Sequence, residues 1–150
     1  MPRLQPLFRA EITLAAAQEL GDTPQGRRRI VPITGGSFRG ERLSGRVLPG
    51  GADWQLIRPD GVAQLEARYT LETDDGVLIY VRNDGYRHGP AEVMRKLAAG
   101  TPVDPSTYYM RTTPRFETAG ARYAWLNGVV CVADGARRAA AVELDVFEVT

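Results

Sequence analysis

The residues best suited to acid–base chemistry lie in the middle of the chain. Asp53 follows the double glycine Gly50-Gly51 and precedes Trp54. A carboxylate beside a large aromatic side chain can be desolvated, and desolvation raises its pKa toward the range useful for a general acid or base. Because neighbouring strand residues point to opposite faces, Asp53 and Trp54 share one cavity only at a bulge. The alternative is that Asp53 caps the turn and Trp54 fills the core.

A second set of candidates alternates along one stretch, where Glu66, Arg68 and Thr70 share a face. If this face lines a cavity, the planar guanidinium of Arg68 would anchor a carboxylate or enolate, and Glu66 would orient it. The alternative is a solvated face with cross-strand ion pairs. Glu117, which follows Phe116, is a further acid–base candidate by the same desolvation argument.

The segment Tyr123–Asn127 is predicted to be a strand that places Tyr123, Trp125 and Asn127 on one face. Two aromatic rings and an amide would line a pocket for a flat apolar ligand, with Asn127 setting its orientation. The alternative is that the rings pack in the core and that Asn127 forms a turn with Gly128.

The chain has few residues that bind transition metals. His88 is the only histidine and Cys131 the only cysteine, and together they cannot build a usual structural zinc site. Asp74-Asp75-Gly76 is better explained as a turn than as a site for a harder metal. His88 is either an acid–base group or an inert loop residue, and the apolar run around Cys131 favours a buried thiol. We expect neither metal nor cofactor.

Three extended segments position the central candidates: Asp53–Arg58, Ala63–Glu72 and Val77–Arg82. Pro59-Asp60-Gly61 separates the first two and Asp74-Asp75-Gly76 the last two, and both breaks are typical of hairpin turns. The sequence therefore predicts a three-stranded antiparallel meander, with the alternation of its middle segment indicating a strand.

The rest of the chain continues this pattern. Short strands with turn signals recur throughout, and Gly35-Gly36 indicates a bulge or barrel corner. One helix is expected over Pro90–Ala99, ended by Gly100, as a lid or plug on a sheet. The predicted fold is mainly β, a single domain over residues 1–150 that forms an antiparallel β-barrel of roughly eight to ten strands with one short helix.

Composition limits the classes of partner. The 150 residues include 19 basic and 18 acidic side chains, so no charge excess favours nucleic acid. No stretch approaches the roughly 20 apolar residues of a membrane helix. Early acidic residues argue against a signal peptide, and the single cysteine suits a reducing compartment, so we expect a cytoplasmic protein with no membrane partner.

Several segments together resemble a known bacterial family. They are Thr34–Gly40, Gly50–Trp54, Ala67–Tyr69, Glu72–Gly76, Tyr109–Thr112, Phe116–Thr118 and Tyr123–Asn127, in this order along nearly the whole chain. The chain resembles the family catalogued as domain of unknown function 3237. That resemblance implies a compact β-barrel and no settled activity.

Two classes of function follow from these residues. The first is a metal-free isomerase, cyclase or lyase that acts on a compact, partly apolar carbonyl or carboxylate compound. Arg68 would stabilise the developing negative charge, and Asp53, Glu66 or Glu117 would move a proton. The second is a barrel that binds a small molecule without chemistry, or a homo-oligomeric scaffold. We expect a small-molecule ligand and leave the homo-oligomer open.

Overall fold

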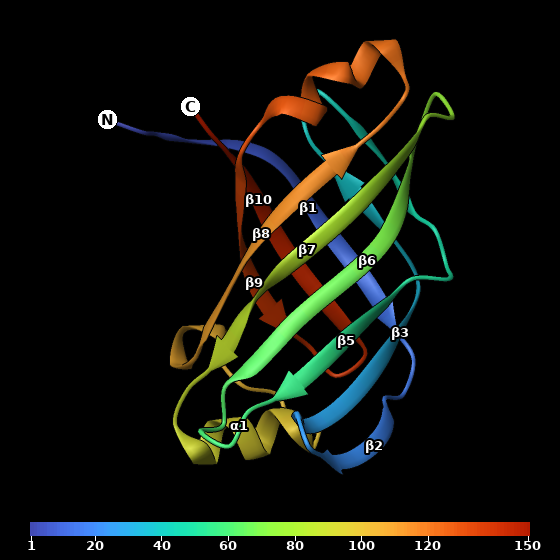
Figure 1. Cartoon of the computed structure of the whole chain (residues 1–150). Coiled ribbons are helices and arrows are strands. Elements are labelled where there is room, and N and C mark those ends of the chain that lie inside the picture. The colour runs from blue at the N-terminus through green and yellow to red at the C-terminus, as the bar shows by residue number, and fades with distance from the viewer.

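The computed structural model describes all 150 residues and consists mainly of strands (Figure 1). The strands are β1 (Leu4–Leu14), β2 (Gln18–Thr23), β3 (Gly26–Arg39), β4 (Ser44–Val47), β5 (Ala52–Ile57), β6 (Ala63–Thr73), β7 (Leu78–His88), β8 (Tyr109–Glu117), β9 (Cys131–Arg137) and β10 (Ala141–Val149). The helical elements are α1 (Ala91–Ala98) and the 3₁₀ segments η1 (Pro105–Thr107) and η2 (Ala121–Gly128).

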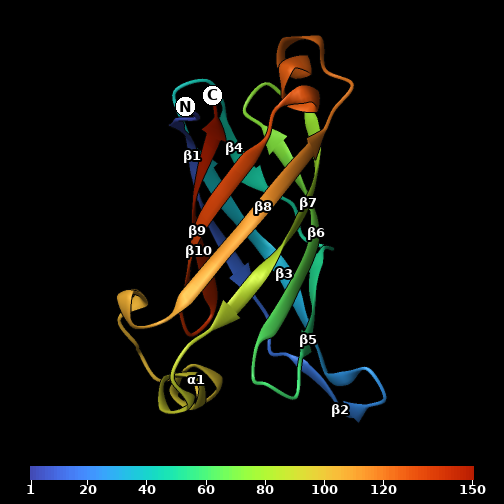
Figure 2. The ribbon, with the colours of Figure 1, turned by 60° about the vertical axis from the view of Figure 1, so that its left-hand side comes forward.

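The strands close into an antiparallel barrel. The sheet runs β1-β10-β9-β8-β7-β6, and then β4 and β5 share the position between β6 and β3. Closure comes from β1, which pairs with β3 as well as with β10. β2 pairs only with β3 and extends that edge beyond the barrel, as Figure 2 shows. The predicted antiparallel barrel is confirmed: nine strands fill eight positions, because β4 and β5 share one, and β2 is an additional strand.

The closing pair depends on a glycine. Gly36 lies opposite Ile12 at φ +135°, and a Cβ atom there would come within 2.0 Å of the carbonyl oxygen of Glu11. A side chain would therefore push β1 and β3 apart. The register shifts between Thr13 and Leu14, so the predicted irregularity at Gly35-Gly36 is present.

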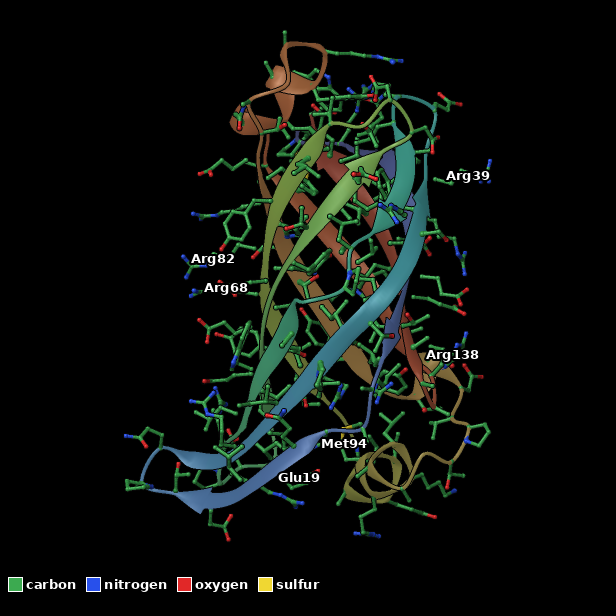
Figure 3. All side chains as sticks on the ribbon, turned by 90° about the vertical axis from the view of Figure 1, so that its right-hand side faces the viewer. Glu19, Arg39, Arg68, Arg82, Met94 and Arg138 are labelled. Atoms are coloured by element: carbon green, nitrogen blue, oxygen red, sulfur yellow. The ribbon has the colours of Figure 1, made fainter.

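The inward face of β6 is a correction to the sequence analysis. Leu65, Tyr69 and Leu71 are buried inside the barrel. Arg68 lies on the opposite, outer face with 48% of its side chain exposed, and Figure 3 shows it pointing away from the ribbon beside Arg82 of β7. The polar face was expected inside, but burying the apolar face removes more hydrocarbon from water and leaves the charges solvated.

The two ends of the barrel are covered differently. α1 lies across one end and η2 across the other (Figures 1 and 2). The helix predicted over Pro90–Ala99 is confirmed, with Pro90 at its N-cap and Gly100 just past its end at φ +76°. The strand predicted over Tyr123–Asn127 is wrong, since these residues belong to η2. Neither cap offers a bilayer span, because no helix has the length and apolar character required.

Burial in the barrel core should dominate stability. Leu71 is 1% exposed in the main hydrophobic cluster, whereas Leu78, on the neighbouring strand, is 54% exposed. We expect Leu71→Ala to lower the free energy of unfolding by about 2–5 kcal/mol and Leu78→Ala to change it by no more than about 0.5 kcal/mol. Urea denaturation measures both, and equal losses would contradict this assignment of the core.

Candidate functional site

A cavity with two unlike walls lies inside the barrel. The centres of water molecules could occupy about 40 Å³ of it. The wall from β1, β3 and β10 is apolar, whereas the wall from β5, β6, β7 and β8 carries nearly all the polar groups. The apolar side chains are Ile12, Leu14, Val31, Ile33, Val142 and Leu144, and the polar ones are Asp53, Gln55, Asn83, Arg87 and Thr112.

Small residues open the space between the polar side chains. Asp53 pairs across β5 and β6 with Ala67, and Ala67 pairs across β6 and β7 with Asn83. The three residues therefore form one row with only a methyl group at its centre. In the next inward row Leu65 pairs with Gly85, which has no side chain. The cavity exists because these positions do not fill the barrel interior.

Asp53 is held by two hydrogen bonds. Its Oδ1 accepts the backbone N–H of Glu66 at 2.8 Å, and its Oδ2 accepts Nε2 of Gln55 at 2.9 Å. Burial raises the pKa of this carboxyl above its usual value, although both hydrogen bonds and the nearby Arg87 and Arg137 oppose the rise. Desolvation outweighs them, so Asp53 is a carboxyl tuned to hold a proton at higher pH.

A chain of contacts runs from Asp53 to the barrel end that α1 covers. Gln55 donates to Asp53, and its Oε1 accepts Nη1 of Arg29 at 3.3 Å. The Nε of Arg29 donates to Oε1 of Glu19 at 2.8 Å, on the extra strand β2. Arg29 therefore fixes which end of the Gln55 amide faces Asp53, and that end is the donor.

Arg87 is the most unusual residue of the cavity. It is 7% exposed, its Nη1 has no hydrogen-bond partner, and its side chain forms no hydrogen bond or ion pair. Burial lowers the pKa of this guanidinium to about 10, while Asp53 opposes the fall and the positive charges of Arg137 and Arg29 add to it. A buried charge without a partner is costly, so Arg87 is poised to bind an acceptor or anion.

Other polar atoms on the same wall also lack partners. The Oδ1 of Asn83 and the Oγ1 of Thr112 are buried without hydrogen bonds. The buried phenol of Tyr69 has its pKa raised by desolvation, so it remains a neutral donor at physiological pH. Because most buried polar groups in proteins are satisfied, several unsatisfied ones facing a single cavity indicate a binding site.

Comparison with known proteins agrees with the fold and the resemblance noted above. Residues 2–149 match the profile of the family described as "Protein of unknown function (DUF3237)". The chain belongs to this family. A UPF0311 protein of Rhodopseudomonas palustris is 52% identical over 129 residues, 86% of this chain and 84% of the relative. One of Clostridium acetobutylicum is 41% identical over 125 residues, 83% of this chain and 79% of the relative.

Solved structures share the DUF3237 barrel. The crystal structure of a conserved protein of unknown function from Rhodopseudomonas palustris superposes with a TM-score of 0.95 at 45% identity, covering 100% of this chain and 98% of the other. A beta-barrel like protein from Acinetobacter baumannii has a TM-score of 0.88 at 47% identity, with 100% and 97% coverage. An enzyme from Penicillium herquei has a TM-score of 0.75 at 22% identity, covering 99% and 95%, and shows a shared fold alone.

Of the site residues expected from the sequence, the DUF3237 barrel places only Asp53 in the interior cavity. Arg68 donates to Glu66 at 3.3 Å on the outer face, and Thr70 shares that face. Trp54 is exposed outside β5, as the alternation from Asp53 requires. The exposed Glu117 ends β8. These side chains do not meet in one pocket.

The three residues expected to line an aromatic pocket belong to the η2 cap instead. Tyr123 is buried and donates from its hydroxyl to Oδ1 of Asp75 at 2.8 Å. Arg42 stacks over Trp125, with its guanidinium carbon 4.2 Å from the ring centroid. Asn127 accepts the backbone N–H of Thr118 at 2.9 Å and donates to the carbonyl of the same residue at 3.0 Å. All three fasten the cap far from the polar cavity.

The remaining reactive side chains lie away from the cavity. His88 stacks on Tyr109, with ring centroids 4.8 Å apart. Cys131 is buried in the main core, and burial raises the pKa of its thiol to about 11, as expected for an inert thiol. The structure contains no group of three His, Cys, Asp or Glu side chains placed to hold a metal ion.

Sequence reasoning missed Gln55, Asn83, Arg87 and Thr112. A signal existed in β7, where Ile79, Val81, Asn83, Gly85 and Arg87 alternate with polar and aromatic residues. The inward face of β7 is apolar at the start of the strand and polar toward its end. This pattern indicates a strand that lines the packed core along one part and a polar cavity along the other.

We expect the carboxyl carbon of Asp53 to titrate with a midpoint above 3.8, because burial disfavours its charge. The folded state then holds this proton more tightly than the unfolded state. Its contribution to stability is fully present below the unfolded pKa and is lost as the pH rises through the folded pKa.

Carbon-detected NMR measures the titration. Asp60, whose bond from Arg58 lowers its pKa to about 2, is an internal control in the same sample. An Asp53 midpoint at or below 3.8 would show that its hydrogen bonds outweigh desolvation.

Proposed function

We propose that this protein binds a compact, partly apolar carbonyl or carboxylate compound inside the barrel and moves a proton on it. The reaction class is that of a metal-free isomerase, cyclase or lyase. The observation that carries the proposal is the unpartnered guanidinium of Arg87 in the same cavity as the hydrogen-bonded, desolvated carboxyl of Asp53.

Asp53 and Arg87 supply the two functions that such a reaction needs. Asp53 as a carboxylate removes a proton from a carbon next to the substrate carbonyl, and the electron pair moves to the carbonyl oxygen. Arg87 donates a hydrogen bond to the resulting enolate oxygen, which stabilises its charge most strongly where water is excluded. Protonated Asp53 then returns the proton to a different carbon in an isomerisation, or exchanges it with solvent.

The surrounding residues hold these two groups in place. Gln55 and the backbone N–H of Glu66 orient the Asp53 carboxylate, and Arg29 orients Gln55. The free acceptors on Asn83 and Thr112 are available to hydroxyl groups of a substrate. The apolar wall opposite would pack against its hydrocarbon part.

One observation favours a second candidate, a barrel that binds without chemistry. Both oxygens of Asp53 already accept a hydrogen bond, at 2.8 and 2.9 Å. Each has a further lone pair, yet a carboxylate so held would also serve as a purely structural link between β5 and β6. Binding without proton transfer would distinguish this candidate.

Hydrogen–deuterium exchange provides the test. We expect the protein to accelerate exchange next to the carbonyl of one or more compounds in a panel of small ketones and oxo acids in D₂O, followed by proton NMR. Asp53→Asn should slow that exchange by about 10²–10⁴-fold, the usual contribution of a general base.

Asp145→Asn is the matched control, because Asp145 lies on the outside of β10 and pairs with Arg9. It should exchange at the rate of the unaltered protein. Panel members that bind, as judged by a thermal shift, and yet show no accelerated exchange would support the non-catalytic barrel instead.

A further inference from the structure

Three arginines from three strands converge at the cavity end that α1 covers. They are Arg29 of β3, Arg87 of β7 and Arg137 of β9. Arg29 and Arg137 both lower the pKa of Arg87, and burial together with Arg29 lowers that of Arg137. We call Arg29, Arg87 and Arg137 the arginine cluster. All three arginines line one hollow at this end of the barrel, and like charges in one hollow repel one another and favour an anion between them.

The acidic side chains near the cluster do not neutralise it. Glu19 is bound to Arg29, with Arg27 also within 3.7 Å of it. Asp53 accepts hydrogen bonds from the side chain of Gln55 and the backbone N–H of Glu66, and none from an arginine. The cluster therefore keeps an excess of positive charge, which is concentrated on the unpaired Arg87.

A hollow outside the barrel leads to this cluster. It lies between α1, the loop after β1 and the open end of the barrel, and it shares Leu14 and Arg87 with the interior cavity. Arg87 thus stands where the outer hollow meets the inner cavity. Arg29 and Arg137 line the outer part.

α1 covers the hollow without filling it. No residue of α1 is buried, although Met94 and Leu97 pack on the small cluster of Ala63, Leu65, Tyr108 and Met110 at this end. Figure 3 shows Met94 between the helix and the strand ends. A ligand entering here meets apolar side chains on the helix and positive charge on the barrel.

From this arrangement we propose that the ligand is an organic carboxylate. Its carboxylate binds the arginine cluster at the α1 end, where Arg87 also reaches the carbonyl oxygen next to that carboxylate, and its apolar body lies along Leu65 and Val142 beside Asp53. This proposal gives the substrate class for the site described under the proposed function. It rests on that function only in placing the ligand in the same cavity. An arginine fork matches the geometry of a carboxylate.

The depth of the cavity limits the size of the ligand. On β6, Ala63 pairs with Arg87 and Ala67 pairs with Asp53. Ala63 and Ala67 are four residues apart on the strand, so the backbone positions of Arg87 and Asp53 are separated by about 13 Å along the barrel, at about 3.3 Å per residue. The long Arg87 side chain bridges part of this length. A carboxylate with a body of one ring or a short chain fits the remainder.

Calorimetric titration with benzoate, phenylacetate, 3-phenylpropionate and the neutral amide of each acid tests the proposal. We expect one or more of the acids to bind the unaltered protein, and to bind at least about 10-fold more tightly than its amide, a difference of about 1.4 kcal/mol. Acids that fail to bind at 10 mM, or amides that bind equally well, would overturn it.

Arg87→Met tests the residue itself. It should weaken binding of the acid by at least about 30-fold, the lower limit for truncating one partner of a buried charge pair, and leave the amide unaffected. Arg82→Met is the matched control, since Arg82 lies on the outer face of the same strand and pairs with Asp84. Equal binding of the acid to Arg87→Met and to the control would overturn the assignment.

Thermal melting separates ligand binding from a structural role. Without ligand, Arg87→Met should melt no lower than the unaltered protein, because an unpaired buried charge has been removed. The acid should raise the melting temperature of the unaltered protein and not that of the variant. A variant that melts lower and still responds to the acid would show that Arg87 is structural.

Asp53→Asn separates this proposal from the proposed function. Removing a nearby negative charge should leave acid binding equal or tighter while proton exchange is lost. Oxo acids that bind to the unaltered protein without proton exchange would contradict the proposed function and leave the carboxylate assignment standing. Proton exchange of neutral ketones as fast as that of oxo acids would support the proposed function and contradict the carboxylate assignment.

Discussion

Closure of the barrel constrains the whole molecule. Once β1 pairs with both β10 and β3, each strand residue faces either the interior or the outside, and neighbouring residues take opposite sides. The interior face of each strand must then be apolar or must find partners inside. This requirement packs the core at the η2 end, where Leu71, Ile79 and Val81 are almost fully buried.

The α1 end departs from that requirement. Along β7 the interior residues change from Val81 to Asn83 and Arg87, and β5 contributes Asp53 and Gln55. Polar groups buried without full partners destabilise a fold, and such departures are concentrated at functional sites. The large, well-packed cluster at the other end offsets the cost, so one half of the barrel provides stability and the other half holds the polar cavity.

Solved structures of related proteins share the barrel fold. The barrels from Rhodopseudomonas palustris and Acinetobacter baumannii superpose over the whole chain, which makes the barrel the common framework of the family. The framework by itself names no reaction, because one fold can carry many functions. In the proposed function, the chemistry depends on Asp53, Arg87 and the side chains that hold them.

The sequence alone determined the local features. It predicted the turns at Pro59-Asp60-Gly61 and Asp74-Asp75-Gly76, the helix between Pro90 and Gly100, and the antiparallel barrel. These features depend on the backbone preferences of single residues and on an alternation of apolar and polar residues that can be recognised within one short strand. It also singled out Asp53, because a carboxylate next to a glycine turn and a tryptophan stands out locally.

Only the tertiary structure decided which face of each strand lies inside. The alternation of Glu66 and Arg68 with apolar residues is the same whether the polar face points into the barrel or out of it. Which face points inward depends on which side chains the neighbouring strands bury. The Tyr123–Asn127 segment has the alternation of a strand, yet it folds into η2 because its contacts with Asp75, Arg42 and Thr118 come from other elements. Arg87 and Asp53 line the same cavity only because β5 and β7 both flank β6, an arrangement that no local pattern encodes.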